Sequence, residues 1–408
     1  MKVKVRRFLF KFVTREFHLC KFKTKRIMVK QKIRMGMVGG GIGAFIGVVH
    51  RMAAALDGEI ELVCGAFSSS PEKSLASAAQ LSLPEDRSYA SFADMIDGEQ
   101  RLPPDRRMQF VSIVTPNHVH FAPAKMALEN GFHVICDKPL AFNMEEALAL
   151  EKLVVDTGLV FALTHNYTGY PMVKQARQMI RHGEIGKIRK VIVEYPQGWL
   201  STHVETKQAA WRTDPARSGI AGAMGDIGTH AANLAEYVTG LRITELCADI
   251  SIFVPGRQLD DDGNVLIRFD NGAKGILHAS QIAAGEENNL NIRVYGEKGG
   301  LEWRQMEPNT LLAKWLDRPT QLYRTGVGTL YPEAMAHFRI PAGHPEGYLE
   351  AFANIYRNFA LTLRAHIEGR APDPIYADFP TVQDGVRGMR FVEKVIASGK
   401  SESKWVIA

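Results

Sequence analysis

The stretch VGGGIGAFIG, residues 38–47, decides the fold, because it holds five glycines in ten positions between two regular apolar segments. The run before it, IRMGMV (33–38), has the short apolar character of a buried strand. The run after it, AFIGVVHRMAAAL (44–56), has the length and apolar face of a helix. The sequence therefore predicts a strand, a tight glycine loop and a helix in direct succession.

In this context Gly39, Gly41 and Ala44 match the dinucleotide-binding pattern G-x-G-x-x-[GA]. The first glycine permits the turn, the second lets the backbone approach a pyrophosphate, and the small third residue lets the helix meet the strand. Ile42 and Gly43 complete the loop, whose helix N-terminus would face the phosphates. A flexible joint without a ligand is the alternative, but the flanking strand and helix favour dinucleotide binding.

Short β-branched runs continue to alternate with helical ones up to residue 165. This alternation is typical of a parallel sheet covered by helices. We therefore predict an α/β fold whose N-terminal domain, residues 31–165, is a doubly wound Rossmann sheet. Its further strands are expected at 60–67, 110–115, 133–140 and 160–167, and its further helices at 70–80, 120–131 and 143–158.

After residue 185 the pattern changes to runs that suit an antiparallel sheet, with glycine-bearing hairpin turns at DNG (270–272) and GEKGG (296–300). We predict a C-terminal α+β domain over residues 166–408 with an open, mostly antiparallel sheet. If both sheet faces are apolar a second subunit must cover one, so we expect a homodimer or homotetramer. Strands are expected at 187–195, 243–253, 264–269, 273–283, 290–296 and 300–304, and helices at 170–183, 225–240 and within 346–398.

The first 30 residues form a basic extension. Residues 1–34 hold thirteen Lys or Arg and one acid, Glu16, so the formal charge of +6 divides into +12 here and −6 elsewhere. Because the chain after residue 34 is acidic overall, it lacks the basic surface that binds nucleic acid. A transit-like peptide or a membrane-surface arm is one interpretation of the extension. We favour a disordered segment, or one upstream of a true start at Met28 or Met35.

The four cysteines are scattered without a C-x-x-C pair, and no apolar run is long enough to span a bilayer. Reduced, unpaired cysteines are typical of a cytoplasmic protein. We therefore expect a cytoplasmic chain that binds neither membrane nor nucleic acid.

The end of the second predicted strand should contact the adenosine ribose of a bound dinucleotide. This place is taken by AFSSS, in which Ser68 and Ser69 follow Phe67 without a carboxylate or an arginine. Serines can bind a ribose hydroxyl or a 2′-phosphate, so both NAD and NADP stay open. The absence of a guanidinium favours NAD slightly.

TPNHVH (115–120) follows the third legible strand, at the edge where a parallel sheet binds ligands. Thr115 and Asn117 could contact the cofactor, or could simply form a turn. His118 and His120 lack a third and fourth partner at metal-binding spacing, so we predict no metal site.

Three chemistry-bearing residues lie further along the chain. Lys138, in CDKPL, ends another strand of the first sheet, and its ammonium could reach a nicotinamide and a substrate oxygen. Asp226 and His230 are four residues apart at the start of a predicted helix, so both can face one cleft. A histidine near its ordinary pKa accepts a proton at neutral pH, as the oxidation of an alcohol requires.

Taken together, these motifs resemble the Gfo/Idh/MocA family of sugar oxidoreductases over about residues 31–400. The resemblance is carried by the glycine loop, TPNHVH, D-K-P in place of the usual E-K-P, HNYTGYP, WRTDPARSG and D-x-G-x-H at 226–230. HNYTGYPMV, QAAWRTDPARSG and HPEGYLEAFANIY look most like levoglucosan dehydrogenase and related sugar 3-dehydrogenases.

The resemblance implies NAD(P)-dependent oxidation of a sugar or polyol hydroxyl, with Lys138, Asp226 and His230 in the catalytic positions. The resemblance also places Trp211 and Arg212 at the nicotinamide end and adds His120 and Asp137 to the cofactor contacts. It makes Asn166, Tyr167 and His344 candidate substrate contacts. For Tyr167 and His344, strand-end packing and a helix start are the alternatives.

The sequence therefore predicts a dehydrogenase that transfers hydride from a secondary hydroxyl of a sugar, anhydrosugar or polyol to nicotinamide. In this scheme His230 takes the hydroxyl proton, Lys138 stabilises the alkoxide, and Asp226 orients the histidine or the sugar. The alternatives are a glycosidase or lyase that oxidises its sugar transiently, and a non-catalytic dinucleotide-sensing subunit. The latter would need neither Lys138 nor His230.

Overall fold

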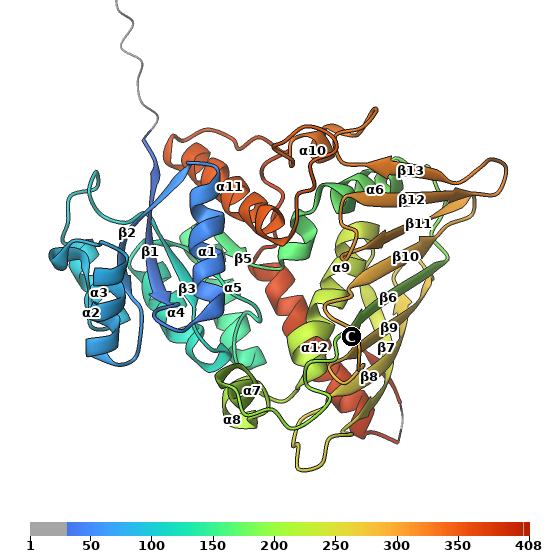
Figure 1. Cartoon of the computed structure of the whole chain (residues 1–408), viewed down its shortest axis with the longest axis horizontal. Helices are drawn as coiled ribbons and strands as arrows, with labels where there is room; N and C mark the ends of the chain where they lie inside the picture. The colour runs from blue at the N-terminus through green and yellow to red at the C-terminus, as the bar shows by residue number, and fades with distance from the viewer. Residues whose placement is uncertain (1–30, 403) are drawn as a thin grey trace, which may run out of the picture. The chain divides into compact units, whose positions relative to one another are not determined.

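Five parallel strands form the first sheet, in the order β2-β1-β3-β4-β5, as drawn in blue and cyan in Figure 1. The doubly wound sheet predicted from the sequence is thus confirmed. The carboxyl ends of all five strands meet at one edge, where ligands of such sheets bind. The strands are β1 (Ile33–Gly39), β2 (Ile60–Ala66), β3 (Phe110–Val114), β4 (His133–Cys136) and β5 (Phe161–Leu163).

Five helices connect these strands, and their ends follow the expected capping chemistry. The side chain of Asn143 accepts a hydrogen bond at the start of one helix, and Gly158 ends the same helix in the left-handed region. One helix, α3, has no counterpart among the predicted elements, because FADMIDGEQ mixes three acids and a glycine with a narrow apolar face. The helices are α1 (Phe45–Leu56), α2 (Pro71–Gln80), α3 (Phe92–Gln100), α4 (Phe121–Glu129) and α5 (Met144–Thr157).

Both faces of the first sheet are buried, and the chain returns from its C-terminal end to cover them. On one face, Phe352, Tyr356 and Phe359 of α11 (Tyr348–Ile367) pack with Ile33 and Phe110. Figure 1 shows α11 beside α1. On the other face, the first half of α12 (Val382–Lys400) joins α4 and α5 in the core. The first sheet is therefore completed by the last quarter of the chain.

The second sheet has nine strands in the order β13-β12-β11-β10-β6-β9-β8-β7-β14, of which β6 to β13 are shown from green to orange in Figure 1. All its pairs are antiparallel except β6 with β9, so the predicted open and mostly antiparallel sheet is confirmed. The strands are β6 (Lys190–Pro196), β7 (Ile243–Ser251), β8 (Asp262–Phe269), β9 (Lys274–Ser280), β10 (Asn291–Tyr295), β11 (Gly299–Arg304), β12 (Thr310–Trp315), β13 (Gln321–Arg324) and β14 (Trp405–Ile407).

Both predicted hairpins form, since β8 pairs with β9 and β10 pairs with β11. The sequence pattern missed β12, β13 and β14. These strands are TLLAKW, QLYR and WVI, of which only the last is rich in β-branched residues, and it has just three positions at the end of the chain. β13 and β14 are the edges of the sheet and β12 lies next to one edge, and such strands form because the neighbouring strand offers hydrogen bonds.

Helices α6 (Pro171–Arg181) and α9 (Thr229–Thr239), with the second half of α12, cover the inner face of the second sheet. The predicted helix at 225–240 is divided: a π-helical turn, η4 (Met224–Gly228), precedes α9. The predicted helical region 346–398 is likewise two helices, α11 and α12, with a loop between them.

Short helical segments complete the fold: α7 (Lys207–Arg212), α8 (Pro215–Ser218) and α10 (Pro332–Met335), with 3-10 turns at Glu85–Arg87, Asn117–Val119 and Asn166–Gly169.

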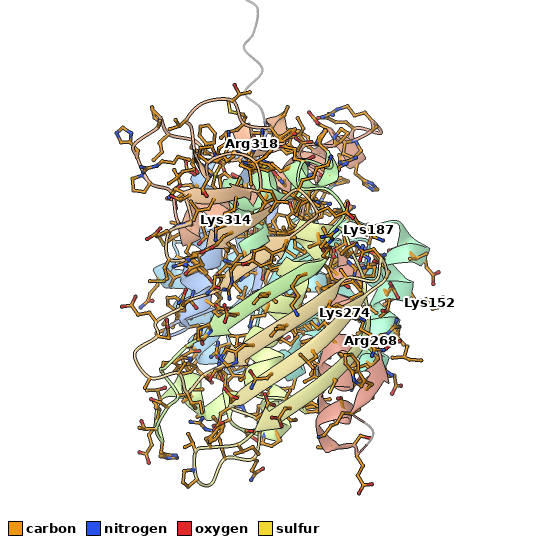
Figure 2. All side chains as sticks on the ribbon, turned by 90° about the vertical axis from the view of Figure 1, so that its right-hand side faces the viewer. Lys152, Lys187, Arg268, Lys274, Lys314 and Arg318 are labelled. Carbon is orange, nitrogen blue, oxygen red and sulfur yellow. The ribbon has the colours of Figure 1, made fainter. Side chains whose placement is uncertain are left out.

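The outer face of the second sheet faces the viewer in Figure 2, where Arg268, Lys274 and Lys314 mark it. It is mixed rather than uniformly apolar, since ion pairs such as Arg268–Glu245 and Lys314–Glu302 alternate with residues such as Leu266. The stated condition for a covering subunit, an apolar outer face, is therefore met only in part. The homo-oligomer stays a prediction.

The computed structural model describes residues 31–402 and 404–408. The expectation for the basic extension, residues 1–30, lies outside the described residues. Within the described ranges, no helix combines the length and the apolar character that crossing a membrane requires.

Candidate active site

A large cleft of about 1630 Å³ runs along the carboxyl edge of the first sheet and continues beneath the second sheet. At one end it is lined by the glycine loop, at the other by side chains from the second sheet and its loops. Such a concave site, with apolar walls and a few polar groups, is the usual form of a binding site. The candidate residues can now be placed along it.

The glycine loop lines the cleft through Gly39, Gly40 and Gly41. A Cβ atom at Gly41 would lie only 2.6 Å from the Oγ of Ser77 and 2.8 Å from the carbonyl oxygen of Phe67. A side chain at this position has no space, which agrees with the close backbone approach that a pyrophosphate needs.

The close contact of helix and strand that was predicted for Ala44 falls instead on Gly47. Ala44 is the N-cap of α1, and Gly47 lies on the first turn, where an added Cβ would be 2.3 Å from the Cα of Gly40. No side chain caps the start of α1 and its first turn contains no acid. The first-turn N–H groups are therefore free to bind an anion. Ile42 lines the cleft, whereas Gly43 is not among its lining residues.

Ser68 and Ser69 line the cleft beyond the end of β2, together with two residues that the sequence pattern did not single out, Glu72 and Lys73. Both belong to the first turn of α2, directly after the Ser70 cap. The Oγ of Ser70 donates to a carboxylate oxygen of Glu72 at 2.7 Å. Thus a carboxylate and an ammonium stand at this edge, although the strand end itself has neither. The Ser-Pro helix start could have signalled them.

Thr115 and Asn117 also line the cleft. The Oγ1 of Thr115 is buried without a hydrogen-bond partner within the described structure, and the amide of Asn117 donates to the carbonyl oxygen of Ser218 at 3.2 Å. His120 lies elsewhere: its ring is buried beneath the loop, 2.7 Å from the carbonyl oxygen of Pro139 and 2.9 Å from that of Thr115. His120 therefore connects the loop after β3 to the loop after β4 through its two ring nitrogens.

Lys138 and Asp226 meet in the centre of the cleft. The Lys138 ammonium donates to the Oδ1 of Asp226 at 2.7 Å and to its carbonyl oxygen at 2.6 Å. The other carboxylate oxygen accepts from Arg212 Nε at 3.0 Å and from the Gln281 amide at 2.9 Å. Asp226 was expected to orient the histidine or the sugar. Both its oxygens are engaged instead by Lys138, Arg212 and Gln281, so it positions the lysine.

The charge of this cluster is fixed by its geometry. Burial disfavours the charged carboxylate of Asp226, but the Lys138 ammonium and the Arg212 guanidinium outweigh it and hold the pKa of Asp226 well below its ordinary value. Asp226 therefore stays ionised and Lys138 keeps a fixed partner. The π-helical turn η4 brings Asp226 to this position, as such turns often do at functional sites.

His230 follows on the first turn of α9 and lines the same cleft. Its Nδ1 lies 3.3 Å from the Nδ1 of His165, and the ring packs edge-on against Tyr167 with centroids 4.9 Å apart. Burial, reinforced by the nearby Lys138 charge, lowers the pKa of His230 well below its ordinary value. The expectation of an ordinary histidine pKa is therefore wrong, because the sequence does not show how deeply the ring is buried. His230 is neutral at pH 7.

Asp137 lines the cleft beside Lys138. Its Oδ1 accepts from the Thr164 hydroxyl at 2.6 Å and from the backbone N–H of Lys138 at 2.9 Å, and lies 3.8 Å from the Nε2 of His50. Burial opposes ionisation, yet His50, Thr164 and Lys138 hold the pKa of Asp137 well below its ordinary value. These contacts fix the loop that presents Lys138.

Trp211 and Arg212 reach the cleft from α7. The Arg212 guanidinium lies over the Trp211 ring, 4.2 Å from its centroid, and 5.8 Å from that of Trp199. These two aromatic rings and the ion pair with Asp226 hold the guanidinium in place.

At the far end of the cleft Asn166 and Tyr167 are joined by groups that the sequence reasoning did not single out. Tyr195 donates to the Oδ1 of Asn288 at 2.7 Å, and the amide of Asn288 donates to the hydroxyl of Tyr167 at 3.1 Å. Gln197 donates to the same Oδ1 at 2.6 Å. These residues come from strand ends and loops of the second sheet, where no local motif marks them.

His344 stands apart from the other candidates. It lies on an exposed loop, its Nδ1 3.1 Å from the carbonyl oxygen of Pro341, and it is not among the residues that line the cleft. The substrate contact predicted for His344 gains no support from this placement. Among the residues that the structure describes, no three His, Cys, Asp or Glu side chains gather as a metal site would require.

Known proteins share both halves of this arrangement. Residues 33–165 match an oxidoreductase family with an NAD-binding Rossmann fold, and residues 173–302 match the GFO/IDH/MocA C-terminal domain. An oxidoreductase from Sinorhizobium meliloti is 48% identical with a TM-score of 0.84, over 92% of this chain and 99% of that one.

Several relatives have a described ligand or activity, among them two that match nearly the whole chain. An inositol dehydrogenase homolog from Azotobacter vinelandii, complexed with NADH and myo-inositol, is 36% identical over 93% of this chain and 98% of that one, with a TM-score of 0.85. Levoglucosan dehydrogenase from Pseudarthrobacter phenanthrenivorans is 27% identical, over 92% of this chain and 98% of its own length. With matches in both halves and across nearly its whole length, the chain belongs to the GFO/IDH/MocA family of oxidoreductases.

Proposed function

We propose that this protein is an NAD-dependent dehydrogenase that oxidises a secondary hydroxyl of an uncharged sugar or polyol. One observation carries the proposal: an ammonium from the first sheet, Lys138, and an imidazole held over the second sheet, His230, line the same cleft beside the glycine loop. The oxidation of an alcohol needs a proton acceptor and a positive charge next to the reacting oxygen. The cleft offers both.

The cofactor end of the cleft fits a dinucleotide. Gly41 lets the backbone of the glycine loop lie close against Ser77 and Phe67, the first turn of α1 offers free N–H groups, and the buried Oγ1 of Thr115 has no hydrogen-bond partner in the described structure. We propose NAD, because Glu72 stands at the adenosine end and the related inositol dehydrogenase homolog and levoglucosan dehydrogenase are complexed with NADH. Lys73 is the residue through which NADP would bind.

The substrate end fits neutral hydroxyl groups. The two cations that contact Asp226, Lys138 and Arg212, are both held by its carboxylate, so neither is left for a phosphate. The Nδ2 of Asn166 is buried without a partner in the described structure, and Asn166 lines the cleft. Groups of this kind bind hydroxyls. The two relatives are complexed with myo-inositol and levoglucosan, which are neutral.

Bound NAD would supply the hydride acceptor. The neutral His230 takes the hydroxyl proton at Nε2, the ring nitrogen that does not face His165. Lys138 stabilises the developing alkoxide with its positive charge. Because the hydroxyl then loses its proton more easily, a weakly basic histidine is sufficient as the acceptor. Asp226, ionised throughout, holds Lys138 in this position, and the aromatic ring of Tyr167 packs against His230.

The direct test is a spectrophotometric screen of the full chain with NAD or NADP against inositols, anhydrosugars, aldoses and their phosphates. We expect reduced nucleotide to accumulate with NAD and neutral substrates. Release of an aglycone without net reduction would indicate a glycosidase or lyase instead. Cofactor binding without turnover on any substrate would indicate a sensing subunit.

A variant sharpens this test. We expect His230→Asn to lower kcat by about 10²–10⁴-fold, because it removes the proton acceptor, with the Kd for NADH unchanged. His344→Ala, on its exposed loop outside the cleft, is the matched control and should keep wild-type kcat. A large loss of NADH affinity in His230→Asn would contradict a role confined to proton transfer.

A further inference from the structure

His165 lies behind His230, outside the cleft. It follows β5 at the carboxyl edge of the first sheet, is 2% exposed and is not a lining residue, whereas its neighbours Thr164 and Asn166 are. Its ring meets that of His230 edge-on, with an interplanar angle of 84° and the two Nδ1 atoms 3.3 Å apart. The two sheets thus contribute one imidazole each to a buried pair.

Two Nδ1 atoms at this distance restrict how the rings carry their hydrogens. A neutral imidazole has one N–H and one lone pair, so one Nδ1 must donate and the other accept. If His230 donates, its Nε2 has a free lone pair and can take a proton. If His230 accepts, its Nε2 already carries a hydrogen and cannot act as a base. Only the first arrangement supports catalysis.

The surroundings of His165 favour the first arrangement. Burial lowers the pKa of His165 to about 4, so the ring is neutral at pH 7 and keeps one lone pair. Its Nε2 lies toward α12, where an added Cβ on Gly388 would be 3.9 Å away. Asp384, on the first turn of the same helix, is the charge that most favours a hydrogen on this ring. A hydrogen on the α12 side leaves Nδ1 as the acceptor.

We infer that His165 is a positioning residue: it accepts the Nδ1–H of His230 and so holds His230 in the tautomer whose Nε2 is free to take the substrate proton. This inference rests on the proposed role of His230. The role of His165 corresponds to that of the carboxylate that fixes a catalytic histidine in a hydrolase triad, except that the acceptor here is a neutral ring. A neutral acceptor adds no charge beside Lys138 and Asp226.

Two substitutions separate the acceptor from the bulk of the ring. The Oδ1 of an asparagine stands as many bonds from Cα as the Nδ1 of a histidine, so His165→Asn keeps an acceptor facing His230. His165→Leu fills similar space without one. We expect His165→Leu to lower kcat by about ten- to a hundredfold with little change in substrate KM or in the Kd for NADH. We expect His165→Asn to stay within about threefold of the wild type.

A spectroscopic measurement tests the same inference without turnover. In the full chain labelled with ¹⁵N-histidine, long-range ¹H–¹⁵N correlations report which ring nitrogen carries hydrogen. We expect protonated Nδ1 and unprotonated Nε2 for His230 and the reverse for His165, with signals assigned by their loss in His165→Asn and His230→Asn.

The outcomes are distinct. Hydrogen on the Nε2 of His230 in the wild type, wild-type kcat in His165→Leu, or equal losses in the Leu and Asn variants would each overturn the inference. An inactive wild-type chain that shows the expected tautomers would overturn the proposed dehydrogenase function and leave the arrangement of the two rings established. Thermal unfolding and NADH binding of both variants separate a local effect from misfolding.

Discussion

The two sheets bury their strands in different ways. In the first sheet successive residues of β3 are all buried, because helices cover both faces. In the second sheet buried and half-exposed residues alternate along β6, because helices cover only one face. A sheet enclosed on both sides holds its edge loops rigidly, which suits cofactor binding. The second sheet, enclosed on one side, contributes separate side chains from its strand ends and loops to the cleft. Its outer face is not covered by helices.

The largest effect should come from removing the charge that the first sheet contributes to the chemistry. We expect Lys138→Met to lower kcat by about a thousandfold at every pH tested, because no titration restores a missing cation. NADH should still bind, since the glycine loop is untouched. Initial rates from pH 6 to 9 check this, with Lys152→Met, at an exposed site with a 75% exposed side chain, as the control. Near-normal activity would show that the first sheet serves the cofactor alone.

The contrast between the sheets predicts a pattern in the free energy of unfolding. In β3, Phe110→Ala and Val111→Ala should both destabilise, by about 2–5 kcal/mol, because both faces are packed. In β8, Ile267→Ala should cost a similar amount, whereas its neighbour Leu266, 49% exposed, should tolerate Ala within about 0.5 kcal/mol.

Urea unfolding at a fixed low protein concentration measures all four variants. An equal and large loss for Leu266→Ala would show that the outer face is buried in solution, as a homo-oligomer requires.

A smaller effect should separate cofactor binding from chemistry. Gly41→Val places a side chain where a Cβ already lies 2.6 Å from Ser77 Oγ. We expect the Kd for NAD to rise about ten- to a hundredfold, since the loop must shift to make room, while kcat at saturating NAD changes little. Fluorescence titration and steady-state kinetics provide the two numbers. A loss confined to kcat would place the pyrophosphate elsewhere.

The difference between the sheets also explains what the sequence could predict. The parallel, doubly wound character of the first sheet, the glycine loop and Lys138 were predictable because local patterns and the carboxyl edge of a parallel sheet determine them. Asp226 and His230 were found through their spacing on one helix. Tyr195, Gln197 and Asn288 were not found, because long-range strand pairing brings them to the cleft and no local pattern marks them. The lowered pKa of His230 was missed for the same reason.

His344 illustrates the limit of a motif. HPEG (344–347) allows either a substrate contact or a helix start, and in the structure α11 begins directly after this motif, at Tyr348. Glu72 and Lys73 illustrate the opposite limit. They lie directly after Ser70 in the first turn of α2, beyond the strand end at which a ribose contact is expected.

The position of α11 has a consequence for how the chain is made. A ribosome releases the polypeptide from its N-terminal end, so the five strands of the first sheet emerge long before Phe352, Tyr356 and Phe359. Until about residue 367 has left the exit tunnel, the part of the nascent sheet that α11 covers faces water, a state prone to aggregation. A fragment that stops at residue 302, where the second family match ends, would carry the same uncovered surface. The first sheet is thus completed only after most of the second sheet has been made, and the two halves of the chain are not separable modules.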